Sequence, residues 1–146
     1  MKLKVEQPVA VICAFLWIGF VGSISFLEAW LKFRAPGVTL PIGLGIGRLV
    51  FAALNKVEWV LAIGILVSIF TNPALKAFKE KLPFFITVLF LIIQTTWLLP
   101  ALDARAEMHI NGQSVPPSNL HIYYVVTEAI KITALFIFGI KLFKKD

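Results

Sequence analysis

A short stretch of the sequence, RLVFAALNKVE at positions 48–58, carries several polar side chains in an apolar frame. The spacing i, i+3, i+7 and i+10 puts one set of residues on a single helical face: Arg48, Phe51, Asn55 and Glu58. The same spacing recurs later in the chain, in His121, Tyr124, Glu128 and Lys131. The two faces therefore predict two walls of a polar site.

The charged members of these faces suggest the chemistry of the site. We expect Arg48 or Lys131 to hold an anionic group. We expect Glu58 or Glu128 to balance that charge or to take up a proton, because burial disfavours an ionised carboxyl. Counted from the outer helix ends at about 1.5 Å per residue, Glu58 and Lys131 lie roughly 15–20 Å deep.

The composition indicates that these helices lie in an apolar environment. The chain has 146 residues, of which 59% are hydrophobic, and its mean hydropathy is +0.88. Soluble domains are roughly 45–50% apolar, so the sequence predicts one integral membrane domain over residues 1–146. The net charge of +6 comes mostly from residues that flank apolar runs. It therefore indicates membrane orientation and not a nucleic-acid partner.

Prolines divide the chain into apolar runs. We expect helices near residues 8–33, 42–71, 83–102 and 119–143, each long enough to cross about 30 Å of hydrocarbon. No proline is expected inside a span, because proline disrupts a helix interior. The first run lacks an A-x-A cleavage site and is expected to stay as a span. The predicted fold class is an all-α membrane protein, a four-helix transmembrane bundle.

Lysines set the predicted orientation. They gather near the N-terminus, in the 71–83 loop and near the C-terminus. Because cytoplasmic segments are enriched in Lys and Arg, we expect both termini inside (N-in/C-in), in the cytoplasmic membrane of a bacterium.

The remaining polar residues lie towards the outer ends of the helices, Glu28 in the first and Gln94, Thr95 and Thr96 in the third. The inner halves are apolar, as in FFITVLF. This asymmetry predicts an outward-facing pocket. A charge at mid-bilayer costs at least about 2.5–3.5 kcal/mol. We therefore expect ion pairs within it: Glu58 with Lys131, Glu128 with Lys131, and Arg48 with Glu28.

Three other signals have ordinary explanations. Cys13 is the sole cysteine and is expected to act as a small hydrophobic residue. The GLGIG segment at 43–47 lacks a preceding strand and a GK[ST] ending, so close helix packing explains it better than phosphate binding. The acidic and histidine residues of the outer half lack the spacing of a metal site, so no metal is expected.

Four segments, SFLEAWLKFRAP, GRLVFAALN, WLLPALDAR and NLHIYYV, resemble a family of small four-helix membrane proteins of unknown function from bacteria and animals. This resemblance implies a multi-pass membrane protein. It puts four residues at family-like positions: Arg48, Pro100, Arg105 and His121.

The opening stretch also resembles the membrane-associated eicosanoid and glutathione metabolism family, whose second helix opens with R-x-x-R-A-x-x-N-x-x-E. Four residues match this pattern: Arg48, Ala52, Asn55 and Glu58. Phe51 stands in place of the second arginine. The resemblance implies part of a glutathione-binding site between helices of a trimer.

These patterns together predict a protein that binds, or binds and passes, a small polar or amphiphilic ligand. The expected ligand-binding residues are Glu28, Arg48, Asn55, Glu58, His121, Tyr124, Glu128 and Lys131. Two alternatives stay open: a membrane enzyme of the glutathione-transferase type, and a structural subunit of a membrane complex. The sequence leaves the identity of any cofactor and of any catalytic residue unknown. The expected partners are the lipid bilayer, the ligand and further copies of the chain.

Overall fold

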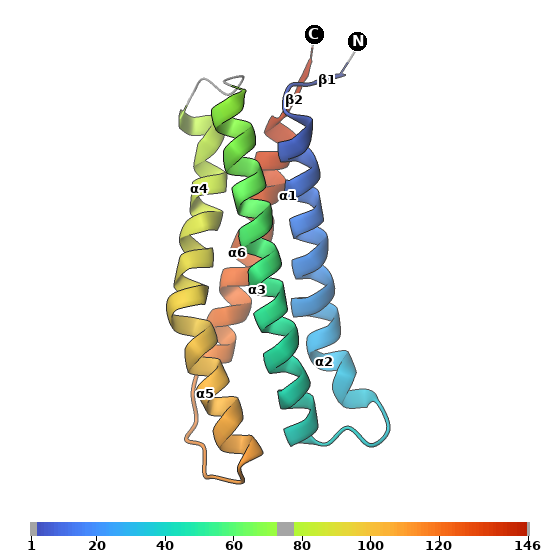
Figure 1. Cartoon of the computed structure of the whole chain (residues 1–146), viewed down its shortest axis with the longest axis vertical. Helices are drawn as coiled ribbons and strands as arrows, with labels where there is room; N and C mark the ends of the chain where they lie inside the picture. Colours follow the sequence, from blue (N-terminus) through green and yellow to red (C-terminus); the bar gives the residue numbers. More distant parts are fainter. Residues whose placement is uncertain (1–2, 73–77, 146) are drawn as a thin grey trace.

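Four long helices form the protein in a computed structural model, which describes residues 3–72 and 78–145. The helices span Pro8–Arg34, Leu40–Thr71, Phe78–Ile110 and Leu120–Lys141, and each is long and apolar enough to cross a membrane. They run side by side along one axis, with both termini at one end (Figure 1). We call this the terminal end. The opposite end, formed by residues 35–39 and 111–119, is the loop end.

Two of the four helices change their winding along their length. The first consists of α1 (Pro8–Val21), the π-helical segment η1 (Gly22–Glu28), α2 (Ala29–Leu31) and a final 3₁₀ turn η2 (Lys32–Arg34). The third consists of α4 (Phe78–Ile93), the π-helical segment η3 (Gln94–Leu98) and α5 (Leu99–Ile110). The second and fourth, α3 (Leu40–Thr71) and α6 (Leu120–Lys141), are α-helical throughout.

The helix boundaries agree with the sequence except in the third helix. There the expected range 83–102 is too short at both ends, because the helix is already formed at Phe78 and continues to Ile110. The expectation that no proline lies inside a span is wrong for Pro83 and Pro100. The start of the polar segment 101–118 is helical and extends the third helix at the loop end.

The structure accommodates both prolines locally. Pro100 follows η3, where the helix is already wound with wider hydrogen bonds: the Leu99 N–H donates to the Gln94 carbonyl, five residues back. Pro83 has no N–H to offer the Lys79 carbonyl. That carbonyl accepts a hydrogen bond from Lys141 Nζ at 3.4 Å instead.

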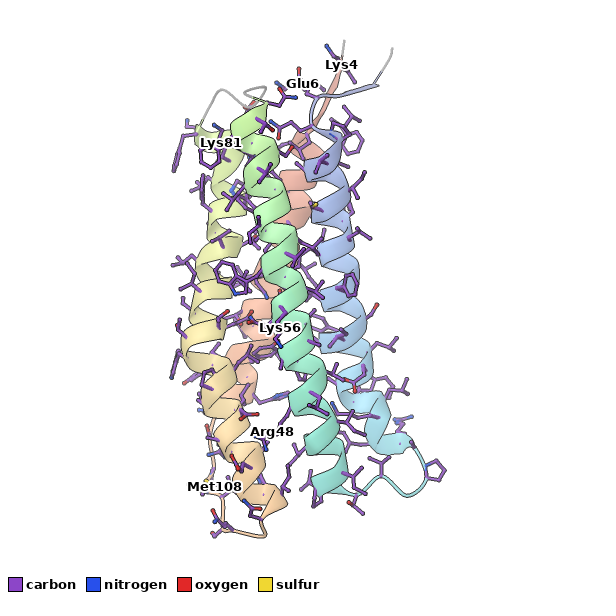
Figure 2. The ribbon with its side chains drawn as sticks, viewed as in Figure 1. Lys4, Glu6, Arg48, Lys56, Lys81 and Met108 are labelled. Carbon is purple, nitrogen blue, oxygen red and sulfur yellow. The ribbon has the colours of Figure 1, made fainter. Side chains whose placement is uncertain are left out.

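The helices pack as a closed bundle. α1 lies against α3 and α6, α4 lies against α6, and α3 lies against α5. The core between them is apolar and dense, and its largest fully buried side chains include Trp17, Phe84 and Phe138. Many large apolar side chains instead face outward (Figure 2), among them Leu49 and Phe70, which are 74% and 78% exposed.

Glycines allow close helix approach at some of the predicted positions. A side chain at Gly43 would overlap the Phe33 ring, and a Cβ at Gly47 would lie 3.0 Å from Lys32 Nζ. Gly45, the middle residue of the GLGIG segment, faces open space. The packing explanation therefore holds for two of these three glycines. A Cβ added at Gly19 or Gly22 would also meet nothing within 4 Å, so close packing does not explain those two glycines.

A small clasp closes the terminal end. Strands β1 (Leu3–Val5) and β2 (Phe143–Lys145) pair antiparallel. Beside them, Lys144 Nζ lies 2.9 Å from Glu6 Oε2, and this carboxylate raises the pKa of Lys144. Asn72 also reaches the clasp, since its Nδ2 donates to the Glu6 carbonyl at 2.9 Å. The clasp ties the two ends of the chain to the end of α3.

Candidate functional site

The predicted polar residues fall into two neighbouring groups. One is a buried charged cluster, which we define as Glu58, Glu128 and Lys131. The other is a cavity between the helices in the half of the bundle nearer the loop end.

The buried charged cluster connects α3 to α6. Lys131 Nζ lies 2.8 Å from Glu128 Oε1 and also donates a hydrogen bond to Glu58 Oε1. The side chains of all three residues are at most 1% exposed. Both predicted pairs, Glu58 with Lys131 and Glu128 with Lys131, are therefore confirmed. Breaking a fully buried pair of this kind typically destabilises a protein by about 3–5 kcal/mol.

Neutral donors from the other two helices complete the cluster. Trp17 Nε1, on α1, donates to Glu58 Oε1 at 2.7 Å. Ser25 Oγ donates to Glu128 Oε2 at 3.0 Å, and Gln94 Nε2 donates to Glu128 Oε1 at 2.5 Å. Ser25 lies in η1 and Gln94 in η3, so each π-helical segment supplies one hydrogen-bond donor to Glu128. π-helical turns inside α-helices are often found at functional sites.

The cavity has a volume of about 620 Å³, within the range of typical ligand sites. All four long helices line it, mostly with apolar groups. Its polar lining residues are Lys32, Arg48, Asn55, Lys56, Thr95, Asp103, His121 and Tyr124. Ala52 and Lys56 on α3 and Pro100 on α5 are exposed lining residues. They mark where the cavity reaches the outer surface of the bundle.

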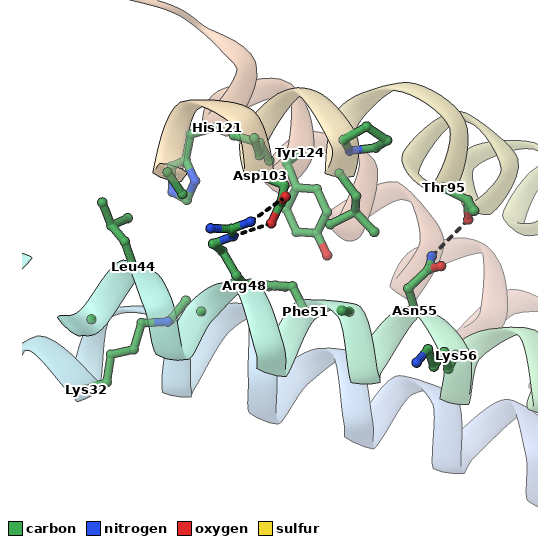
Figure 3. A pocket seen from close by; sticks show the side chains of 18 of the residues that line it. Lys32, Leu44, Arg48, Phe51, Asn55, Lys56, Thr95, Asp103, His121 and Tyr124 are labelled. Carbon is green, nitrogen blue, oxygen red and sulfur yellow. Dashed lines mark hydrogen bonds and ion pairs between the residues drawn. The ribbon is translucent and has the colours of Figure 1, made fainter. Parts of the chain in front are cut away.

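An ion pair crosses the cavity wall near the loop end. Arg48 donates twice to Asp103, from Nε to Oδ1 at 2.5 Å and from Nη2 to Oδ2 at 2.9 Å (Figure 3). Glu107 Oε2 is a further 3.7 Å neighbour of the guanidinium. The expected pair of Arg48 with Glu28 is not formed, since Glu28 pairs with Lys32 at 3.2 Å. Asp103 is available because the third helix continues through Pro100.

The deeper part of the cavity has a hydrogen-bonded wall and one charged side chain. Asn55 Nδ2 and Trp59 Nε1 both donate to Thr95 Oγ1, at 2.9 Å and 3.0 Å. Lys56 lies beside them, midway along α3 (Figures 2 and 3). Within residues 3–72 and 78–145, no carboxylate pairs with Lys56.

Tyr124 separates the cavity from the buried charged cluster. Its ring meets the Phe51 ring edge to face, with centroids 5.3 Å apart, and both residues line the cavity. Its hydroxyl has Ser25 and Glu128 as polar neighbours. One buried side chain thus touches both groups.

The predicted site residues can now be placed. Four of them line the cavity: Arg48, Asn55, His121 and Tyr124. Three form the buried charged cluster: Glu58, Glu128 and Lys131. Glu28 lies outside both groups, next to Lys32 of the cavity wall. Several contributing residues were not among the expected ligand-binding residues: Trp17, Ser25, Lys32, Lys56, Gln94, Thr95 and Asp103. Trp17 and Ser25 had no visible signal because each is an isolated residue in an apolar run.

The chemistry of the arrangement follows from these positions. Of the residues that match the glutathione-family pattern, Arg48, Ala52 and Asn55 line the cavity, whereas Glu58 belongs to the buried charged cluster. The described part of the chain has no group of three His, Cys, Asp or Glu side chains placed to hold a metal ion. The cavity can therefore offer cationic and hydrogen-bonding groups next to apolar surface.

No protein-family model, curated protein or solved structure matches the chain.

Proposed function

We propose that the protein is a multi-pass integral membrane protein whose cavity binds a small amphiphile with an anionic group. Support for membrane insertion comes from the four apolar helices and from the large apolar side chains that face outward. Monomeric soluble proteins rarely expose large apolar patches.

The proposed orientation places the terminal end in the cytoplasm and the loop end outside. The terminal end carries Lys4 and Lys81 (Figure 2). It also carries Lys79, Lys141 and Lys144. The loop end carries Lys32, Arg34 and Arg105, so the excess of basic residues favours the terminal end as the cytoplasmic one. With this orientation, the cavity lies in the outer half of the membrane.

The observation that carries the ligand proposal is the position of Lys56. It lies 16 residues into the 32-residue α3, beside a mostly apolar cavity, with no carboxylate paired to it in the described part of the chain. An ammonium group at this depth costs at least about 2.5–3.5 kcal/mol unless it is paired or reaches water. A carboxylate or phosphate group on a ligand would supply that pair.

The other cationic side chains near the cavity are less suited to pair with an anionic group of a ligand. Arg48 is neutralised by Asp103 and Lys32 is paired with Glu28. Lys131, which the sequence offered as an anion holder, is enclosed by two carboxylates. We therefore assign the anionic group to Lys56 and the apolar part of the ligand to the cavity walls. The exposed lining residues on α3 and α5 would let such a ligand enter from the lipid phase.

A binding experiment with two matched probes tests this function. The probes are a fluorescent long-chain fatty acid and its neutral methyl ester, titrated against the protein in a maltoside detergent. Wild type should bind the acid about tenfold or more tightly than the ester, since a hydrogen bond to a charged group contributes about 1.5–3 kcal/mol. Lys56→Gln should lose this preference, and Lys81→Gln, a lysine outside the cavity, should keep it. Equal binding of acid and ester by wild type would contradict the proposal.

A further inference from the structure

The buried charged cluster does not balance its own charge. Glu58, Glu128 and Lys131 carry a total charge of −1 when all three are ionised. Each side chain is at most 1% exposed, so water cannot compensate the excess. A buried uncompensated charge is far more costly than a neutral hydrogen-bonded group.

No neighbour among the described residues supplies the missing positive charge. In the described part of the chain, the ionisable groups that face Glu58 are Glu128, Lys131 and Tyr124, all on α6. The other elements packed around the cluster contribute only neutral groups, Trp17 from α1, Ser25 from η1 and Gln94 from η3. The cluster is therefore one positive charge short.

We propose that the buried charged cluster is a proton-binding site, which holds one exchangeable proton on its carboxyl pair at neutral pH. With that proton, the cluster contains one carboxyl, one carboxylate and one ammonium, and its net charge is zero. Two carboxylates that share a site readily share one proton.

The hydrogen bonds indicate which oxygen takes the proton. Both oxygens of Glu128 accept hydrogen bonds, Oε1 from Gln94 and Oε2 from Ser25, and Oε1 also forms the ion pair with Lys131. Glu58 Oε1 accepts from Trp17 and Lys131, but Glu58 Oε2 is buried and has no partner among the described residues. Protonation forms an O–H bond at this oxygen and breaks one in a hydronium ion of the solvent, which becomes a water molecule.

A metal cation fits the cluster less well than a proton. Cations such as Na⁺ or Ca²⁺ take several oxygen ligands. Here the carboxylate oxygens already face an ammonium group and N–H or O–H donors. The oxygens left without a donor in the described part of this cluster are Glu58 Oε2 and Gln94 Oε1, which is too few to form a coordination shell.

The route to water leads through the cavity. On the terminal-end side, the cluster is covered by buried apolar side chains that include Ile65, Leu135 and Phe138. On the other side, Tyr124 touches both Glu128 and the cavity. The proton should therefore exchange with the cavity side only.

Infrared spectroscopy tests this proposal without any ligand. The protein is measured at neutral pH in a maltoside detergent, which has no ester or carboxyl group to overlap the signal. Wild type should show the C=O stretch of one protonated carboxyl, with a shift in D₂O. The band should be lost in Glu58→Gln and in Glu128→Gln, because one carboxylate then balances Lys131. It should be unchanged in Glu28→Gln, and it should double in Lys131→Met, where neutrality requires two protonated carboxyls.

Two results would overturn the proposal: a wild-type spectrum without the band, or a band that persists unchanged in both glutamine variants. If those variants fail to fold, the comparison moves to the partly exposed carboxylates. Glu6→Gln and Glu28→Gln must then each keep the wild-type band, and its loss in either variant would also overturn the proposal. Because the measurement uses no ligand, its outcome is separate from that of the fatty-acid titration.

Discussion

Lys131 and Glu58 lie 73 positions apart in the sequence and meet as a fully buried ion pair. Lys131 also holds Glu128 on its own helix. The pair thus connects α3 to α6 at the level where the π-helical segments of the other two helices supply Ser25 and Gln94. This arrangement leads to predictions for both stability and binding.

The buried charged cluster has one more carboxyl than cation. Removing the cation should therefore lower the free energy of unfolding more than removing one carboxyl. Lys131→Met leaves two buried carboxyls without a cation and should lower the free energy of unfolding by about 3–5 kcal/mol. Glu58→Gln leaves the neutral pair of Glu128 and Lys131 and should cost clearly less. Thermal unfolding in detergent measures both, with Lys81→Met as the surface control. A larger loss in Glu58→Gln than in Lys131→Met would contradict the charge count.

The hydrogen bond from Trp17 to Glu58 predicts a specific requirement for an indole. Trp17→Phe keeps an aromatic ring in the core but removes the N–H donor, so it should cost about 1–3 kcal/mol. Trp97→Phe is the matched control, since Trp97 is 53% exposed. Thermal unfolding should show a lower transition for the first variant and little change for the second. If both variants shift the unfolding transition equally, the N–H donor of Trp17 does not contribute to stability.

The contact between α1 and α3 predicts a rescue experiment. A Cβ at Gly64 would lie 2.9 Å from Cys13 Sγ, so Gly64→Ala should destabilise the protein by about 1–3 kcal/mol through overpacking. Cys13→Ala removes the sulfur and should restore most of this loss in the double variant. Gly45→Ala faces open space in the same helix and should be neutral or slightly stabilising. A double variant no more stable than Gly64→Ala would disprove the contact.

The proposed orientation predicts which cysteines a membrane-impermeant thiol reagent reaches. In a Cys13→Ala background, Ser114→Cys at the loop end should react in intact cells. Lys4→Cys at the terminal end should react only after the cells are permeabilised. The reverse pattern would invert the orientation and place the cavity in the cytoplasmic half of the membrane.

Simple physical rules link some features of this fold to the sequence, but not others. Helical spacing was enough to predict that Glu58 and Glu128 both reach Lys131, because the side chains of a helix repeat every 3.6 residues. The length of the third helix could not be read, since proline normally ends a helix and only the π-helical turn before Pro100 permits it to continue. The pairing of Arg48 with Asp103 was missed for the same reason.

Native mass spectrometry of the protein purified in detergent tests the central claim of ligand binding most directly, and it also reports the oligomeric state. The spectra of wild type, Lys56→Gln and Lys81→Gln are compared. We expect wild type and Lys81→Gln to retain an anionic amphiphile, and Lys56→Gln to lose it. A retained mass that is the same in all three proteins, or bare protein in all three, would contradict this expectation.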